Sequence, residues 1–356
     1  MKRKLFVIIT TIFCCFALSF SFACSCTAAS LNFNDNYTST GTGSALDSYT
    51  ETATYSVVYK MNEKATSSIV EELYGTYVTE FSHISLADLK RVMDPDGTNT
   101  ENYESATKDY TGSVYRLKTT QTMSGAYKLD ETAERAEVAD VIESTVYFKN
   151  MDNEFKPMYA VKNYKSTTPV NTSAVKVLIY SVKTTYYKKN AVSVIETSDE
   201  NTLSLFRANG MIKKDATSGT RTVKKVSSAF DNDQLLFVVR SLLTSKFSSS
   251  LTLLEPTEGA KKTVSVKVNT DSASQQCKAY TDAEGKEISF ACYKTTITLS
   301  NNSYSGTSKT AYFINKEQNA TESQQKTYGN ILIKYIDPIV YLNGNLEYTL
   351  TKYVRS

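Results

Sequence analysis

Residues 175–197 read VKVLIYSVKTTYYKKNAVSVIET, and this stretch indicates how most of the chain folds. Residues 175–187 and 191–197 are rich in Val, Ile, Thr and Tyr, the residue types that favour strands. Apolar and polar residues alternate along both segments, which is typical of strands with one buried face. Lys188-Lys189-Asn190 lies between them and predicts a turn. The stretch therefore predicts a β-hairpin in an antiparallel sheet.

The same pattern recurs along most of the remaining chain, where its 25 tyrosines and 15 phenylalanines stand largely among Val, Ile and Thr. Residues 132–142 fit either a strand or a helix. Because few helical segments separate the strands, we predict a mainly β fold: a large, strongly curved antiparallel sheet (half-barrel) with one or two short helices packed on it. The further strands are expected at 54–61, 76–84, 112–123, 144–150, 156–165, 262–268, 277–281, 287–299, 310–315, 330–335 and 346–354.

Two segments predict helices. Residues 85–93 begin with Ser85 as an N-cap and carry apolar residues at helical spacing. Residues 234–243 follow an Asp231-Asn232-Asp233 cap and are apolar on nearly every side apart from Arg240 and its neighbour. Such a helix should be covered by sheet rather than lie on the surface. We expect Arg240 to pair with a buried carboxylate, since an unpaired buried charge is costly, and a cavity-facing Arg240 is the alternative.

The first thirty residues are typical of an export signal. Lys2, Arg3 and Lys4 precede an uncharged apolar run at 5–22, and small residues follow. The sequence therefore predicts an extracytoplasmic protein, either of the cell envelope or secreted.

Three fates of this segment are compatible with the sequence. Cys24 follows Ser-Phe-Ala, which resembles the lipobox of bacterial lipoproteins, and Cys26 is a second lipidation candidate. Cleavage after Ala23 or Ala29 would release the protein, and an uncleaved segment would remain as an N-terminal anchor. We favour lipidation, because an acylated terminus holds a folded domain at a membrane surface without spanning the membrane.

The chain divides into three parts. Residues 1–23 are expected to be the signal peptide. Residues 24–53, which include TSTGTGS at 38–44, have little apolar surface to bury and predict a flexible Ser/Thr-rich tether. Residues 54–356 would form the curved β domain, with a candidate internal boundary in the polar stretch at 207–225.

Charge argues against a nucleic-acid partner. The chain holds 40 basic and 37 acidic residues, and three of the basic residues belong to the signal segment. The mature chain is therefore formally neutral and has no dense basic cluster. Such a chain suits neither nucleic acid nor electrostatic docking to a membrane.

Beyond the signal region only Cys277 and Cys292 remain. The segment between them reads as strand, turn and strand, with the turn at 282–286. A two-residue loop would place the cysteines directly opposite each other, and a three-residue loop would make them diagonal neighbours. Both arrangements put them on one face of the sheet, so they are candidates for a cross-strand disulfide. Two buried thiols are the alternative.

Signals for chemistry are weak. His83, expected on a strand, is the only histidine, and Gly-rich phosphate loops are absent. Residues 94–99 (DPDGTN) resemble part of a calcium loop, but Gly97 comes two positions early, and a Pro-Asp-Gly turn explains the same residues. The sequence therefore predicts no catalytic residue, no cofactor, no metal site and no enzymatic activity.

By order of elements, residues 54–354 resemble bacterial envelope proteins built on a bent antiparallel half-barrel, such as the lipoprotein-carrier proteins and uncharacterised lipoprotein families. The resemblance implies a concave, partly apolar sheet face. It carries no motif, so it assigns no functional residue.

Two functions fit these observations. The first is a non-enzymatic, membrane-tethered protein whose bent sheet holds an apolar or amphipathic ligand, such as a lipid or an envelope glycoconjugate. The alternative is a structural or adhesive cell-surface protein without a small-molecule ligand. They differ in the interior: a carrier needs an unfilled apolar concavity, whereas in the alternative the helix at 234–243 and side chains fill it.

Overall fold

The computed structural model describes residues 50–356 except for 63–68, 152–153, 172–173, 225–228, 242, 244–247, 256–259, 270–275, 282–284, 300–307 and 316–329. The predicted signal peptide, Cys24, Cys26 and nearly all of the predicted tether lie outside the described residues.

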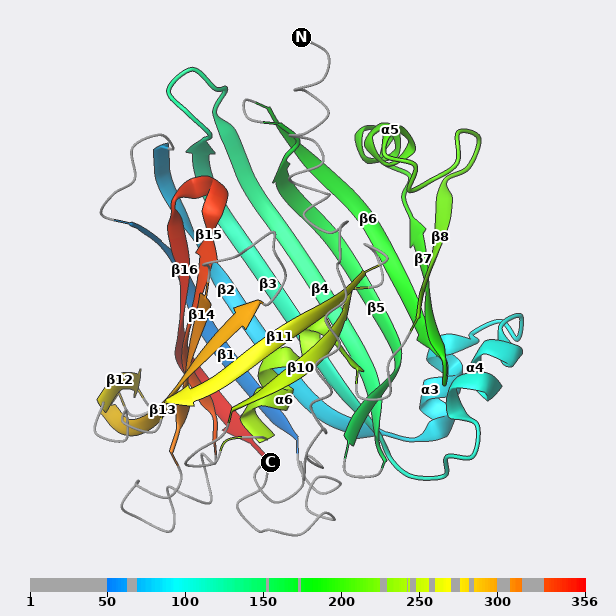
Figure 1. Ribbon diagram of the computed structural model, residues 1–356. Coiled ribbons are helices and arrows are strands. Elements are labelled where there is room, and N and C mark those ends of the chain that lie inside the picture. The colour runs from blue at the N-terminus through cyan, green and yellow to red at the C-terminus, as the bar shows by residue number, and fades with distance from the viewer. Residues whose placement is uncertain are drawn as a thin grey trace.

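The described chain is mainly β (Figure 1). Its helices are short: α3 (Leu86–Met93), α4 (Thr100–Thr107), α5 (Glu200–Ala208) and α6 (Leu235–Ser241), with single 3-10 turns η2 (Asn232–Gln234) and η6 (Val340–Leu342). The strands are β1 (Glu51–Met61), β2 (Ile69–Ile84), β3 (Val114–Lys128), β4 (Ala136–Met151), β5 (Glu154–Pro169), β6 (Val175–Tyr186), β7 (Asn190–Glu196), β8 (Ser218–Lys224), β9 (Ala229–Asp231), β10 (Ser248–Glu255), β11 (Ala260–Asn269), β12 (Gln276–Thr281), β13 (Glu287–Leu299), β14 (Ser308–Ile314), β15 (Leu332–Ile339) and β16 (Gly344–Arg355).

All of these strands belong to one sheet. Its order is β8-β7-β6-β5-β4-β3-β2-β1-β16-β15-β14-β13-β11-β10-β9, and β12 pairs with β13 off this path. Neighbours are antiparallel except β9 and β10, which are parallel. The first and last strands of the chain lie side by side in the middle of the sheet, where Thr50 and Ser356 exchange backbone hydrogen bonds of 2.8 and 3.1 Å.

The sheet is rolled, so that it has an inner and an outer face. In Figure 1 the strands β10 and β11 pass in front of β4 and β5. Ala229 of β9 and Leu254 of β10 belong to one buried cluster with Val146, Ala160 and Tyr186 on the inner face of the opposite wall. One edge of the sheet is therefore tucked inside the roll, and all three residues of β9 are buried.

Helix α6 lies inside the roll (Figure 1), and its apolar side chains belong to the main buried cluster. Asp231 and Gln234 form a capping box that starts η2 and leads directly into the helix. The ring centroid of Phe237 in α6 lies 5.2 to 5.4 Å from the ring centroids of Phe81, Phe148 and Phe155. The apolar helix is therefore covered by sheet, as its sequence predicts.

The other helices lie at the rim of the roll. On the outer face, α3 and α4 pack over Tyr147 and Met158, and together they form a small hydrophobic cluster separate from the main core. The capping box between Ser85 and Asp88 confirms the predicted N-cap of α3. Asp199 is the N-cap of helix α5, and its side chain accepts a hydrogen bond from the backbone of Thr202.

The predicted fold class is confirmed: one large, mostly antiparallel sheet with few short helices. The ambiguous segment at 132–142 becomes strand β4 from Ala136 onward, after a turn closed by Asp130. The sequence did not predict α4, α5, β8, β9 or β10. Residues 207–225 hold the end of α5 and β8, which is one edge of the sheet. In the described part of the chain, no helix combines the length and apolar character needed to cross a membrane.

Candidate functional site

A small cavity remains between α6 and the inner face of β1 to β3. Its volume is about 50 Å³, room for one or two water molecules rather than for a lipid chain. Apolar residues such as Leu117, Leu236 and Phe313 line it together with polar groups from Glu51, Tyr77, Thr119, Asp233 and Arg240.

A buried ion pair closes one side of this cavity. Arg240 of α6 donates to both carboxylate oxygens of Glu51, at 2.6 and 2.9 Å. The Tyr353 hydroxyl donates to the same carboxylate at 2.8 Å. All three residues are buried. The pairing of Arg240 with a buried carboxylate is therefore confirmed, and the pair joins the helix to the first and last strands.

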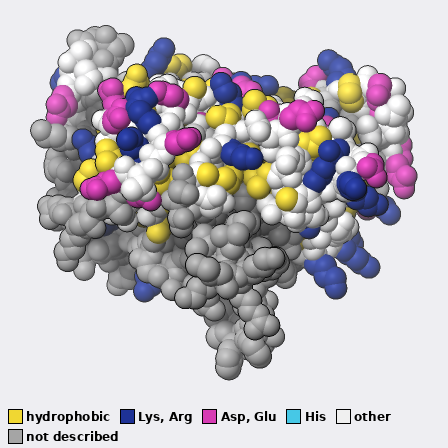
Figure 2. Space-filling model, turned by 90° about the horizontal axis from the view of Figure 1, so that it is seen from above, with side chains coloured by type: hydrophobic (Ala, Val, Ile, Leu, Met, Phe, Trp, Pro, Cys, Tyr) yellow, Lys and Arg dark blue, Asp and Glu magenta, His cyan; other side chains and the backbone are white. Residues whose placement is uncertain are grey.

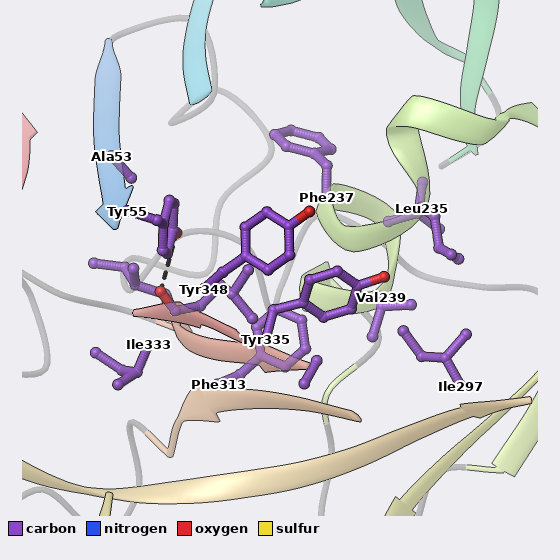
Figure 3. Close-up of a cluster of buried hydrophobic side chains, with 14 of the residues drawn as sticks. Ala53, Tyr55, Leu235, Phe237, Val239, Ile297, Phe313, Ile333, Tyr335 and Tyr348 are labelled. Carbon is purple, nitrogen blue, oxygen red and sulfur yellow. Dashed lines mark hydrogen bonds between the residues drawn. The ribbon is translucent and has the colours of Figure 1, made fainter. Parts of the chain in front are cut away.

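Tyrosines form the inner wall beside the cavity (Figure 3). Tyr55 donates to the backbone oxygen of Leu332 at 3.0 Å, and Tyr348 accepts from Gln121 at 3.2 Å. The ring centroids of Tyr77 and Tyr348 lie 5.5 Å apart, and those of Tyr335 and Tyr348 lie 5.3 Å apart. Burial raises the pKa of each of these hydroxyls well above the usual value for tyrosine.

A second polar cluster lies where the tucked edge meets the opposite wall. We call it the seam cluster; it consists of Ser144, Lys162, Tyr186, Asp231, Asn232 and Asp233. The Lys162 ammonium donates to Asp231 at 2.9 Å, to Asp233 at 2.8 Å and to Asn232 at 2.5 Å. Ser144 donates to Asp233 at 2.6 Å, and Tyr186 donates to Asp231. The buried Lys162 ammonium therefore has hydrogen-bond acceptors from the turn at 231–233 that begins at the end of β9.

The charge of Asp233 is stabilised within this cluster. Burial raises the pKa of its carboxyl, but the Lys162 ammonium and the hydrogen bond from Ser144 outweigh that effect. The pKa of Asp233 therefore lies below its ordinary value of 3.8.

Three charged side chains on the inner side of the roll remain partly exposed. Lys309 pairs with Asp337 at 2.9 Å, and these two side chains and that of Asp233 are between 26% and 29% exposed. Water therefore reaches part of the interior beside the tyrosines.

The outer face carries a much larger hollow, of about 690 Å³, across β4 to β8. Its floor includes a row of polar residues that face one another on consecutive strands. We call it the polar row; from β4 to β8 it comprises Glu143, Asn163, Ser181, Glu196 and Ser218.

An apolar row runs beside the polar row. Val141 and Ile179 flank Lys165 in the next register position and are 40% and 45% exposed. The hollow therefore combines aliphatic side chains with a few polar groups, a combination that ligand pockets also show.

Charges of both signs are mixed on the end of the roll seen in Figure 2, where Lys and Arg are interspersed with Asp and Glu. Within the hollow, Glu196 pairs with Lys183 at 3.2 Å, and Lys165 lies one register position from Glu143. The hollow is therefore close to neutral.

The cysteines give a partial result. In the β12–β13 pairing, Cys277 stands opposite Phe290, which makes it a diagonal neighbour of Cys292 rather than its direct partner. Cys292 is buried, but the side chain of Cys277 lies outside the described residues. The disulfide between them therefore stays a prediction, as does lipidation of Cys24 or Cys26.

The calcium-like segment is a turn. Both carboxylate oxygens of Asp94 are used, by the Asn99 backbone at 2.6 Å and the Thr100 hydroxyl at 2.5 Å. Asp96 accepts from the backbone and hydroxyl of Thr98, and Gly97 has a φ of 75°. His83 lies on β2, exposed. Among the described residues, no group of three His, Cys, Asp or Glu side chains is arranged to hold a metal ion.

Comparison with known proteins adds little. No family model matches the chain, and no curated protein matches it. Among solved structures, it is similar to a beta-barrel-like protein of a domain of unknown function, DUF1849, from Brucella abortus. The TM-score is 0.44 at 10% sequence identity, over 86% of this chain and 98% of that one. The resemblance to lipoprotein-carrier proteins stays a prediction.

Proposed function

We propose that the protein is an exported, membrane-tethered structural or adhesive protein that is not an enzyme and contacts other molecules through its outside. The observation that supports this function is the packing of the described residues inside the roll. Helix α6 and its aromatic neighbours occupy the core there, and the cavity that these described residues line measures about 50 Å³. A carrier of lipids needs a far larger apolar space.

The anchor belongs to the same proposal. A lipid on Cys24 or Cys26 would attach the domain through the tether, which enters the sheet at Glu51. The neighbouring chain end, Ser356, lies at the same end of the roll as Thr50. An anchored domain would therefore be held at that end, with its long outer walls free to meet partners.

The alternative is a carrier of an apolar or amphipathic ligand in the cell envelope. The observation that favours it is the partial exposure of Asp233, Lys309 and Asp337 on the inner side of the roll. A ligand head group would meet charges of both signs there, beside the tyrosines of the inner wall.

Native mass spectrometry of the protein, purified gently from the envelope fraction of its own host, distinguishes these functions. We expect an acyl mass on the N-terminal cysteine and no second, non-covalent mass. A non-covalent mass that organic extraction removes would contradict the structural function and identify the ligand class of a carrier. A bare chain that starts near residue 24 or 30 would contradict the lipid anchor.

A further inference from the structure

The polar row on the outer face has the geometry of a linear binding site. Each of its five residues stands on the next strand in the sheet, from β4 to β8. Because neighbouring strands lie about 4.8 Å apart, the row presents a hydrogen-bonding side chain at that interval over about 19 Å. The row runs across the strands, so a polymer that follows it would lie perpendicular to them.

The interval favours one class of polymer. Side chains on one face of an extended peptide recur about every 6.6 to 6.8 Å, which does not match the row. One sugar ring in an extended β-linked chain advances by nearly the distance between two strands. Amide, carboxylate and hydroxyl groups, which the row supplies from Asn163, Glu143 and Ser181, are the groups that pair with sugar hydroxyls.

The surroundings of the row agree with this class. Val141 and Ile179 present exposed aliphatic groups beside the row, against which the apolar face of a sugar ring can pack. Charge balance in the hollow disfavours a polyanion, because Glu196 is paired with Lys183 and Lys165 stands beside Glu143. The hollow of about 690 Å³ has room for several sugar rings.

We propose that the polar row and its flanking aliphatic residues bind an extended, uncharged β-linked glycan chain on the outer face of the roll. This inference rests on the proposed adhesive function and names its ligand class. It assigns the contact to the side chains of β4 to β8, whose arrangement comes from strand register rather than from any contiguous motif.

Isothermal titration calorimetry with chitohexaose and cellohexaose tests the site. We expect the full-length mature protein to bind at least one of these hexasaccharides with a stoichiometry of one. The matching disaccharide should bind at least about tenfold more weakly, because it spans only part of the row. The double variant Glu143→Ala/Asn163→Ala should weaken hexasaccharide binding by at least about tenfold, since two hydrogen bonds are lost.

A matched control lies elsewhere on the outer face. Glu80→Ala/Lys118→Ala removes a comparable exposed cross-strand pair from β2 and β3, and should leave binding unchanged. Thermal unfolding of both double variants should match that of the parent, since these side chains are on the surface.

Three outcomes would overturn the site: neither hexasaccharide binds, polygalacturonate binds in their place, or both double variants bind as the parent does. Pull-down of the parent and the Glu143→Ala/Asn163→Ala variant with insoluble envelope polymer separates this failure from that of the adhesive function. If both are retained equally, adhesion stands and the site is wrong. If neither is retained and lipid extracts with the protein, the adhesive function is wrong.

Discussion

Lys162 of β5 and Asp231 of β9 form a buried ion pair of 2.9 Å between two strands that stand near opposite ends of the sheet order. The pair exists only because the sheet is rolled, and it lies at the contact between the tucked edge and the opposite wall. Asp231 also begins the turn that leads into α6. One contact therefore fixes both the edge of the sheet and the helix that fills the core.

Loss of the Lys162 charge should destabilise the fold strongly. Lys162→Met leaves the buried Asp231 and the partly exposed Asp233 without their cation, and we expect the free energy of unfolding to fall by about 3–5 kcal/mol, mainly through Asp231. Urea denaturation at neutral pH measures the change. Lys183→Met is the matched control, because its ion pair with Glu196 is exposed and should contribute at most about 1 kcal/mol.

If Lys162→Met does not fold, the double variant Lys162→Met/Asp231→Asn provides the second measurement. Removing both charges should recover part of the lost stability. Equal stabilities of Lys162→Met and Lys183→Met would show that the seam cluster does not hold the roll together.

Stability should also fall in acid through Asp233. Its folded-state pKa is lowered, so the stability it contributes is fully present above its ordinary pKa of 3.8 and is lost as the pH falls through the lower folded value. Urea midpoints measured between neutral pH and about pH 2 give the profile. Asp233→Asn should flatten the acid limb, and an unchanged slope would contradict this assignment.

The Arg240–Glu51 pair should show strong coupling. Arg240→Leu leaves the buried Glu51 carboxylate with the Tyr353 hydroxyl as its remaining side-chain partner among the described residues, and we expect a loss of about 3–5 kcal/mol. The combined variant Arg240→Leu/Glu51→Leu should be more stable than Arg240→Leu alone, because neither charge then remains buried. A double-mutant cycle in urea measures the coupling, and strictly additive losses would argue against a direct pair.

Alkaline titration should find several tyrosines that resist ionisation. Burial, with the nearby Tyr147 and Glu196, raises the pKa of Tyr159 to about 12, and Tyr335 and Tyr348 lie well above the usual value of 10. These groups keep their protons in the folded state, so the stability they contribute is present below pH 10 and is lost as the pH rises above it. Phenolate absorbance should increase in two phases, the second coinciding with unfolding. A single phase near pH 10 in the folded protein would contradict their burial.

Much of the sheet could be predicted from the sequence, because many strands are rich in Val, Ile, Thr and Tyr and one hairpin follows another. The β6–β7 hairpin is an example. Its turn is closed by a backbone hydrogen bond of 2.8 Å from the Tyr187 N–H to the Asn190 carbonyl oxygen. The burial of helix α6 could also be predicted, because an almost entirely apolar segment must be covered. The pairing of Arg240 with a carboxylate followed, because an unpaired buried charge is costly. Strand β9, with three buried residues, and β10, rich in serine, give no such signal.

The candidate site could not be predicted, because its residues share no local pattern. Asn163 and Ser181 look like ordinary exposed positions in their own strands, and only the register of five strands aligns them. The seam cluster is hidden for the same reason. Lys162 alternates like a solvent-facing residue, and nothing near it in the chain indicates that the far edge of the sheet will cover it.

The pairing of β1 with β16 has a consequence for the order in which the sheet can form. The first strand to leave the ribosome finds one of its two neighbours only when the last twelve residues of strand have been made. Until then the chain can form two separate half-sheets, each with an apolar face in water. Under the export proposed above, a chain that crosses the membrane before β1 and β16 pair would complete its sheet only on the far side.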